Sequence, residues 1–206
     1  DEARDVGLLE DAGVNLVFLP AVEQMYPDGA VTTVHVDGPL GSTLEGAARP
    51  GHFDGVATVV AKLFNVVDPD FAVFGQKDAQ QVAVIRRMVR DLSYRTEIVV
   101  APTVRERDGL AASSRNAYLT AADRDAALAL HRALVDGEEA CRGDGPGAAA
   151  ERMRDVLAET AGLEPDYAAA VDPYSFETPS DGGPVLLAVA ARVGRTRLID
   201  NVLVQP

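Results

Sequence analysis

The chain has 206 residues and a formal net charge of −13, and 47% of its residues are hydrophobic while 25% are charged. This composition is typical of a soluble globular protein with a real core, and the excess of negative charge argues against a nucleic-acid-binding protein, which would present a basic face. The single cysteine, Cys141, excludes an internal disulfide and is typical of a reducing cytoplasm, and the apolar stretches are too short to span a bilayer.

The first part of the chain alternates helical patterns with short apolar runs. Residues 5–12 have a helical pattern that stops at Gly13. Residues 14–19 form a β-branched apolar run before Pro20, which predicts a buried strand. Apolar side chains then recur at helical spacing over residues 54–66.

A second buried strand is predicted at residues 70–74, and it runs directly into Gly75-Gln76-Lys77-Asp78. Residues 80–92 predict an amphipathic helix, and residues 96–100 predict the next strand. Helices that alternate with short buried strands indicate an α/β domain with a mostly parallel sheet.

The pattern changes after about residue 118. Thr120 followed by Asp123 is a variant capping box, which predicts a helix from there to about residue 136. A glycine-rich loop at 143–147 separates it from a second helix ending near residue 162. Three strands are predicted after that helix, at residues 167–171, 185–191 and 197–202. We therefore predict two domains, residues 1–117 (α/β) and residues 118–206 (small α+β).

The run Phe74-Gly75-Gln76-Lys77-Asp78 is the sharpest local motif. In open parallel sheets, ligands bind beyond the carboxyl ends of the strands. The free amides of a helix N-terminus attract phosphate there, and a lysine adds a point charge. An ordinary polar loop with a solvated lysine is an equally good interpretation of this motif taken alone.

A second motif is Ala112-Ser113-Ser114-Arg115-Asn116. Two hydroxyls beside a guanidinium suit the recognition of a triphosphate whose charge moves as pyrophosphate departs. The alternative is a serine pair that caps a helix next to a surface arginine. Gln81 lies four residues after Lys77, so we expect the two side chains to lie beside each other.

Taken together, these segments resemble the pantothenate synthetase family in order and spacing, over essentially the whole chain. The segments that carry the resemblance are Arg49-Pro50-Gly51-His52-Phe53-Asp54-Gly55, Phe74-Gly75-Gln76-Lys77-Asp78, Pro102-Thr103-Val104-Arg105, Asp108-Gly109-Leu110, Ser113-Ser114-Arg115-Asn116-Ala117-Tyr118-Leu119 and Gly194-Arg195-Thr196-Arg197-Leu198-Ile199-Asp200-Asn201.

The resemblance implies a Rossmann-like domain of the nucleotidyltransferase type, incomplete at its N-terminus, and a smaller α+β lid domain. It implies a cytoplasmic homodimeric ligase that adenylates pantoate with ATP and Mg²⁺, releases pyrophosphate, and lets β-alanine displace AMP. The expected ATP-binding residues are Gly75, Gln76, Lys77, Asp78, Val104, Ala112, Ser113, Ser114 and Arg115. Lys77 and Arg115 are expected to be catalytic, Gln81 is expected to bind pantoate, and no side chain is assigned as a metal ligand.

The chain also departs from the family pattern. The His-x-Gly-His segment of the family has no counterpart among its three histidines, His35, His52 and His131, so the 206 residues by themselves are expected to be inactive. We expect His52 to be a structural histidine that could line the pocket. At three positions this chain has another residue than is usual in the family: Gln76 replaces Glu, Ala79 replaces Tyr, and Ala112 replaces Met or Leu.

Two alternatives to the ligase remain open. One is a diverged adenylate-forming enzyme that uses another small hydroxy acid or another amine, because the small side chain of Ala79 would widen the acid pocket. The other is a non-catalytic remnant that serves as a binding or oligomerisation module. A substrate panel discriminates the first alternative, because differences of a methylene or two are worth only about 1–3 kcal/mol and leave faint marks in a sequence.

Overall fold

A computed structural model describes residues 2–29 and 31–205. The chain divides into two compact units, residues up to 33 and residues from 34 onwards. The first unit contains helices α1 (Glu2–Asp11) and α2 (Val22–Met25). The predicted helix in this region is therefore present, and it begins a few residues earlier than expected.

The buried strand predicted at residues 14–19 is not formed. These residues adopt no regular structure, and Leu16 and Leu19 are 85% and 60% exposed. A β-strand is defined by hydrogen bonds to a neighbouring strand, and no described residue pairs with this segment. The composition of the run predicts a strand, but the partner that would make it a strand cannot be inferred from the run itself.

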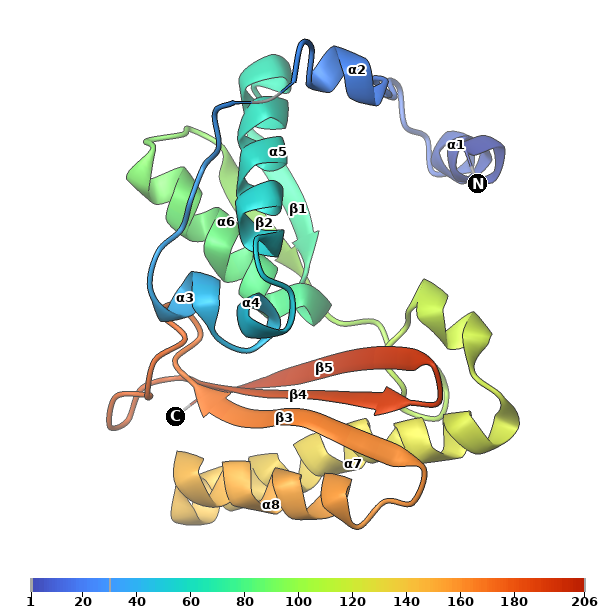
Figure 1. The fold of residues 1–206 in the computed structure, drawn as a ribbon, viewed down its shortest axis with the longest axis vertical. Helices are drawn as coiled ribbons and strands as arrows, with labels where there is room; N and C mark the ends of the chain where they lie inside the picture. The colour runs from blue at the N-terminus through green and yellow to red at the C-terminus, as the bar shows by residue number, and fades with distance from the viewer. Residues whose placement is uncertain (1, 30, 206) are drawn as a thin grey trace. The chain divides into compact units, whose positions relative to one another are not determined.

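The second unit begins with a parallel α/β half (Figure 1). Its elements are α3 (Pro39–Ser42), α4 (Glu45–Ala48), α5 (His52–Val67), β1 (Phe71–Gly75), the 3₁₀ turn η1 (Gln76–Asp78), α6 (Ala79–Asp91) and β2 (Glu97–Ala101). Strands β1 and β2 are parallel neighbours, with Phe71 opposite Glu97 and Gly75 opposite Ala101. Their carboxyl ends therefore lie at the same edge, where η1 begins.

Strand β1 is half-buried, whereas the sequence predicted a buried strand. Ala72 and Phe74 pack against the core formed with α5 and α6. Phe71 and Val73 point to the opposite face and are 62% and 66% exposed. Side chains alternate between the two faces of a strand, and the described helices of this half cover only one of them.

The second half combines helices with an antiparallel sheet. Its elements are the 3₁₀ turn η2 (Ser114–Tyr118), α7 (Ala121–Asp144), α8 (Pro146–Ala158), β3 (Leu163–Val171), β4 (Val185–Val193) and β5 (Thr196–Val204), with the strand order β3-β4-β5. The predicted capping box is confirmed, because Thr120 Oγ1 accepts a hydrogen bond from the amide of Asp123, whose carboxylate in turn accepts one from the Thr120 amide.

Helix α7 is longer than predicted and ends at Asp144 rather than near residue 136. Gly137 lies inside it because α8 packs closely there: a β-carbon at this position would approach Met153 Cγ to 2.6 Å. Gly145, with φ +89°, separates the two helices, and Pro146 starts the second one. Of the glycine-rich loop predicted at 143–147, Gly145 alone is outside a helix.

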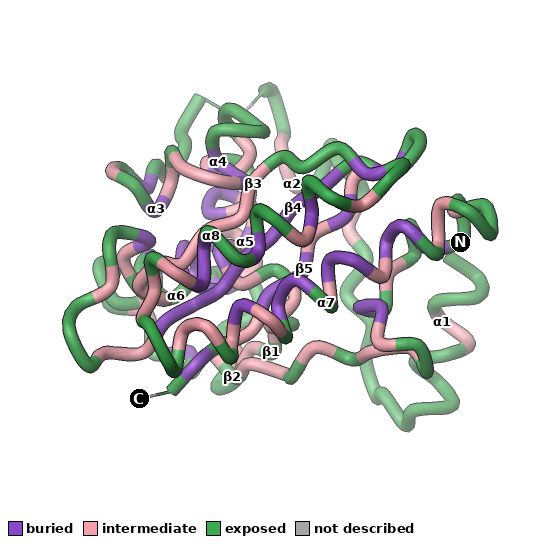
Figure 2. Tube along the Cα trace, turned by 90° about the horizontal axis from the view of Figure 1, so that it is seen from below, coloured by how far each residue is buried: buried purple, intermediate pink, exposed green. Residues whose placement is uncertain are grey.

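Strand β4 is buried on both faces from Val185 to Ala191, which explains the apolar sequence of these seven residues (Figure 2). Leu187 and Val189 pack into the core shared with α7 and α8. Leu186 and Ala188 point to the other face and line a cavity. The sheet therefore rests on two helices with one face and covers a cavity with the other.

This arrangement agrees with a parallel α/β part followed by a small α+β part. Residues from 34 onwards nevertheless form one compact unit, and the predicted boundary between residues 117 and 118 stays a prediction. Within residues 2–29 and 31–205, no helix combines the length and the apolar character needed to cross a membrane.

Candidate active site

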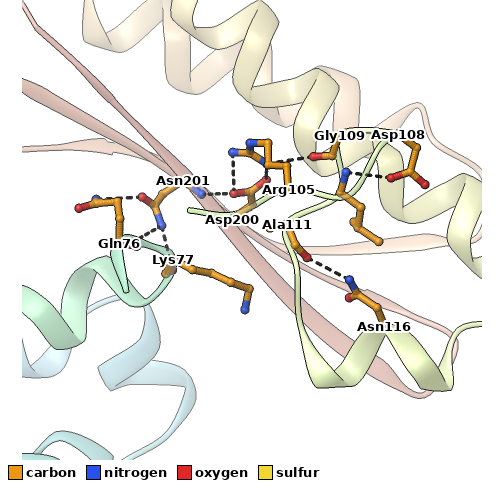
Figure 3. A network of polar contacts seen from close by, with 10 residues as sticks. Gln76, Lys77, Arg105, Asp108, Gly109, Ala111, Asn116, Asp200 and Asn201 are labelled. Carbon is orange, nitrogen blue, oxygen red and sulfur yellow. Dashed lines mark hydrogen bonds and ion pairs between the residues drawn. The ribbon is translucent and has the colours of Figure 1, made fainter. Parts of the chain in front are cut away.

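The turn after β1 is held against the antiparallel sheet. The side-chain amide of Asn201, on β5, donates hydrogen bonds to the carbonyl oxygens of Gln76 (3.1 Å) and Lys77 (2.9 Å). Gln76 Nε2 donates back to Asn201 Oδ1 at 3.1 Å. Figure 3 shows the Lys77 side chain extending from this turn, and its ammonium group makes none of the hydrogen bonds or ion pairs found among the described residues. The backbone of Lys77 is therefore fixed while its charge is available.

An inner cavity lies between the turn, α4, α5 and the face of the antiparallel sheet that α7 and α8 leave uncovered. Its polar lining residues are Glu45, Arg49, His52, Lys77, Asp78, Gln80, Gln81, Tyr167, Asp200 and Asn201. Its apolar lining residues are Leu44, Phe53, Ala79, Phe176, Leu186, Ala188 and Ile199. This mixture of an apolar wall with convergent polar groups is characteristic of small-molecule sites.

An outer cleft adjoins the inner cavity. Its lining residues are Glu45, Ala48, Arg49, Lys77, Asp78, Ser113, Arg115, Glu164, Pro165, Asp166, Arg192, Arg197, Leu198 and Ile199. Lys77 and Asp78 line both spaces, so the turn after β1 stands at the junction between them. A ligand with a small apolar part and a long charged part could occupy the two together.

The structure brings five of the predicted site residues to these two spaces. Lys77, Asp78, Ser113 and Arg115 line the outer cleft, and Gln81 lines the inner cavity. The other predicted residues, Gly75, Gln76, Val104, Ala112 and Ser114, are not among the lining residues. Lys77 and Gln81 lie on successive elements, η1 and α6, and still line the same cavity.

Two hydrogen bonds stabilise the second loop of the site, one between Val104 and Ala112 and one between Ser113 and Arg115. Val104 is 72% exposed, and its carbonyl oxygen accepts a hydrogen bond of 2.8 Å from the amide of Ala112. Ser113 Oγ accepts a hydrogen bond from the amide of Arg115 at 3.2 Å and so caps η2. The capping interpretation of the serine pair therefore holds for Ser113, which also lines the cleft.

Positive charge gathers in the outer cleft although the protein is strongly acidic. Lys77, Arg115 and Arg192 line it, and they take part in none of the ion pairs of the described residues. Arg49 also lines it and donates to a histidine rather than to a carboxylate. Cations that no carboxylate neutralises make this cleft attractive to a polyanion.

A buried ion pair, formed by Glu45 and Arg197, lies between the inner cavity and the outer cleft. Glu45 is 8% exposed and accepts hydrogen bonds from Arg197 at 2.8 and 2.6 Å and from the Tyr167 hydroxyl at 2.9 Å. Arg197 also donates to Asp166 at 2.8 Å. Burial, followed by the negative charge of Glu45, raises the pKa of Tyr167, so this phenol stays protonated. The cluster is fully paired and acts as a rigid wall.

The two glutamines at the start of α6 have different roles. Gln80 is buried, donates to the carbonyl oxygens of Leu40 and Thr43, and accepts from the amide of Glu45. It therefore fastens α6 to the segment that carries α3 and α4. Gln81 lines the inner cavity and makes no such bonds among the described residues, so its amide is available to a ligand.

Of the three histidines, His52 lines the inner cavity. Arg49 Nη1 lies 2.9 Å from its Nε2, and since a guanidinium can only donate, Nε2 accepts and the ring is neutral. Burial, followed by the charge of Arg49, lowers the pKa of His52. His35 pairs with Asp54 at 2.7 Å outside both spaces.

A network of polar contacts supports the second loop (Figure 3). Arg105 makes a bidentate contact with Asp200 on β5, at 2.6 and 3.1 Å, and also donates to the carbonyl oxygen of Gly109. Asn116 donates to the Ala111 carbonyl oxygen at 3.0 Å. These contacts close the loop that leads to Ser113 and Arg115.

Sequence reasoning missed the residues that hold the site together. They are Glu45, Tyr167, Arg197, Asp200 and Asn201, with Arg105 as the partner of Asp200. Three of them, Arg197, Asp200 and Asn201, occur in the family-like segment at the end of the chain. That conspicuous charged segment in an apolar strand was the available signal, but nothing in it identified the partners.

Comparison with known proteins identifies the family. The family model for pantoate-beta-alanine ligase matches residues 1–203. Pantothenate synthetase from Herpetosiphon aurantiacus is 52% identical over 209 residues, which is 98% of this chain and 75% of that protein. The counterpart from Acidobacterium capsulatum is 55% identical over 203 residues, covering 97% and 67%.

Solved structures agree. The pantothenate synthetase of Thermus thermophilus superposes with a TM-score of 0.93 at 48% identity, covering all of this chain and 75% of that one. A Francisella tularensis pantoate-beta-alanine ligase, solved with beta-gamma ATP and beta-alanine, gives a TM-score of 0.77 at 30% identity, covering 98% and 70%. Both the predicted resemblance and the predicted fold class are confirmed: the chain belongs to the pantoate-beta-alanine ligase family.

Proposed function

We propose that this protein joins pantoate to β-alanine at the expense of ATP, through a pantoyl adenylate, and that the inner cavity and outer cleft form its site. The observation that carries the proposal is the convergence of Lys77, Ser113 and Arg115 on one cleft. These residues come from two loops that are 36 to 38 positions apart in the sequence, and both loops belong to the segments that resemble the family.

In the first step, a carboxylate oxygen of pantoate attacks the α-phosphorus of ATP, and the bond to pyrophosphate breaks. Negative charge grows on the departing pyrophosphate, so cations held in place beforehand lower the barrier. Lys77 and Arg115 supply these cations from opposite loops, and Ser113 adds a hydroxyl donor. The ATP-binding residues predicted from the sequence also include Val104. Its side chain is exposed, so we assign it a contact with ATP at the protein surface.

The lining of the inner cavity matches the chemistry of the acid. Gln81 offers a free amide there, and the apolar lining includes Phe53 and Leu186. Pantoate combines hydroxyl groups with a branched hydrocarbon, so an amide beside apolar side chains matches it. Gln80 is excluded from this role because its side-chain amide is already fully bonded to the protein.

In the second step, the amine nitrogen of β-alanine attacks the acyl carbon, the bond to AMP breaks, and the amine loses a proton. This step depends mainly on holding the two reactants in contact without water. The neutral ring of His52 lines the inner cavity, and the paired cluster around Glu45 closes one wall. These residues shape the space without adding an unpaired buried charge.

We propose that Mg²⁺ accompanies ATP. Mg²⁺ is usually held by substrate phosphates and one or two carboxylates rather than by a cage of protein ligands. Among the described residues, no three His, Cys, Asp or Glu side chains gather around a possible ion, while the exposed Asp78 lines both spaces beside Lys77. Asp78 therefore fits as the carboxylate near the metal, which would neutralise phosphate charge when bound.

Family resemblance also supports a cytoplasmic homodimer, and light scattering on the natural protein tests the dimer.

The function itself is tested by pyrophosphate release with pantoate, while the amine is varied. We expect release to require pantoate, and amide formation to require β-alanine. Release with a different hydroxy acid and not with pantoate would overturn the assignment of the acid. No release with any acid would overturn the assignment as an adenylating enzyme.

A further inference from the structure

The two loops that form the proposed ATP site are both fastened to adjacent residues of one strand. Asn201 on β5 bonds to the backbone of Gln76 and Lys77. Asp200, its neighbour, bonds to Arg105 in the loop that leads to Arg115. Both β5 residues belong to the antiparallel sheet, which lies at the far end of the sequence from the turn after β1.

We propose that Asp200 and Asn201 are positioning residues for adenylation, which set the geometry of the two loops that contact ATP. This inference rests on the proposed function. Neither residue is required to touch the reacting atoms. Their effect reaches the substrate through Lys77 and through the loop that carries Ser113 and Arg115.

The Asn201 contacts determine the shape of the turn. Its two side-chain N–H bonds are both used on consecutive carbonyl oxygens, and its side-chain oxygen accepts from Gln76 Nε2. Asn201 is 5% exposed, so water cannot easily replace these bonds. Fixing two consecutive peptide planes fixes the direction in which the Lys77 side chain leaves the turn.

Asp200 acts in the same way on the other loop. Its carboxylate is 2% exposed and is occupied by Arg105 and by the amide of Asn201, at 2.8 Å. The backbone of Arg105 forms an isolated antiparallel β-bridge with that of Ala111, and the Arg105 side chain donates to the carbonyl oxygen of Gly109. The amide of Asn201 therefore links the two anchors, and a displacement of β5 at this point would move both loops.

The expected loss of kcat/KM for ATP follows from the sensitivity of catalysis to the geometry of the site. A misplacement of about 1 Å in a site can cost about 100-fold in rate. We therefore expect Asn201→Ala to lower kcat/KM for ATP about 10- to 100-fold in pantoate-dependent ATP–pyrophosphate exchange. Asn201→Asp should lower it further, because its carboxylate oxygens would face two carbonyl oxygens. Asp200→Asn should also lower it, because an amide nitrogen cannot accept from Arg105.

The control for stability is Val204→Ala on the same strand. Val204 is buried in the core shared with α7 and α8 and lines neither the cavity nor the cleft. It should lower the melting temperature at least as much as Asn201→Ala, while kcat/KM for ATP stays within twofold of the wild type.

A double-mutant cycle distinguishes positioning from a general structural effect. If Asn201 acts through Lys77, Asn201→Ala should have less than a threefold effect in a Lys77→Ala background. Equal effects in both backgrounds, or normal kcat/KM for ATP in Asn201→Ala, would overturn the inference while leaving the ligase activity of the wild type intact. Absence of pantoate-dependent exchange in the natural protein without any of these substitutions would instead overturn the proposed function.

Discussion

Lys77→Ala is the change that separates catalysis from folding most cleanly. The Lys77 ammonium takes part in none of the hydrogen bonds or ion pairs of the described residues, and the Lys77 backbone carbonyl accepts a hydrogen bond from Asn201. Truncating the side chain therefore removes no hydrogen bond or ion pair found among the described residues, and we expect the free energy of unfolding to change by less than about 0.5 kcal/mol.

The catalytic effect should be much larger. A unit charge about 4 Å from a phosphate oxygen is worth about 4 kcal/mol at an effective dielectric constant of about 20. Removing one preplaced donor from such a site usually costs about 2.7–4 kcal/mol, or about 10²–10³ in rate. The two estimates agree, so we expect adenylation to slow by about 10²- to 10³-fold.

The assay is pantoate-dependent ATP–pyrophosphate exchange in the natural protein, with urea unfolding measured in parallel. Arg95→Ala is a matched control, because it changes the net charge equally. Arg95 is an exposed residue just before the amino end of β2, at the opposite edge from the site, and its loss should leave exchange within twofold of the wild type. A folded Lys77→Ala protein with exchange within threefold of the wild type would refute the assignment of Lys77 to the phosphates.

Three further predictions concern the walls of the inner cavity. Glu45→Gln should lower the free energy of unfolding by about 2 kcal/mol in urea titrations, because the half-buried guanidinium of Arg197 loses its buried charged partner; an unchanged midpoint would contradict this. The pKa of His52 is lowered in the folded protein, so the unfolded chain takes up its proton first and stability should fall as the pH drops below about 6.5. This fall in stability should be smaller in His52→Gln. If stability depends on pH identically in the variant and the wild type, the ring is not buried enough for its pKa to be lowered. Ala79 lines the inner cavity, so Ala79→Tyr should leave pantoate turnover unharmed or improve it, and should shift the ratio of kcat/KM for pantoate over larger hydroxy acids toward pantoate; an unchanged ratio would remove position 79 from the pocket.

Local features of the fold could be predicted from the sequence because their causes are local. The capping box at Thr120 needs two residues three positions apart. The apolar run of β4 is visible in the sequence of the strand itself. The turn at Lys77 follows from a strand that runs directly into a helix, and the structure places it at the junction of cavity and cleft.

The parts that could not be predicted depend on contacts between distant residues. Arg197 pairs with Glu45 across 152 positions, and Gln76 pairs with Asn201 across 125. A single sequence shows the charges but not their partners. The prediction of a strand at residues 14–19 was wrong for the same reason, because a strand exists only where a neighbouring strand supplies hydrogen bonds.

The adenylate is the central claim, and the fate of the carboxylate oxygen tests it most directly. Pantoate labelled with ¹⁸O in its carboxylate is converted with ATP and β-alanine by the natural protein, and the products are analysed by mass spectrometry. If the carboxylate attacks the α-phosphorus, the bridging oxygen leaves with AMP, so the account predicts one ¹⁸O atom in AMP and none in pyrophosphate. Unlabelled AMP, or label in inorganic phosphate formed together with ADP, would contradict it.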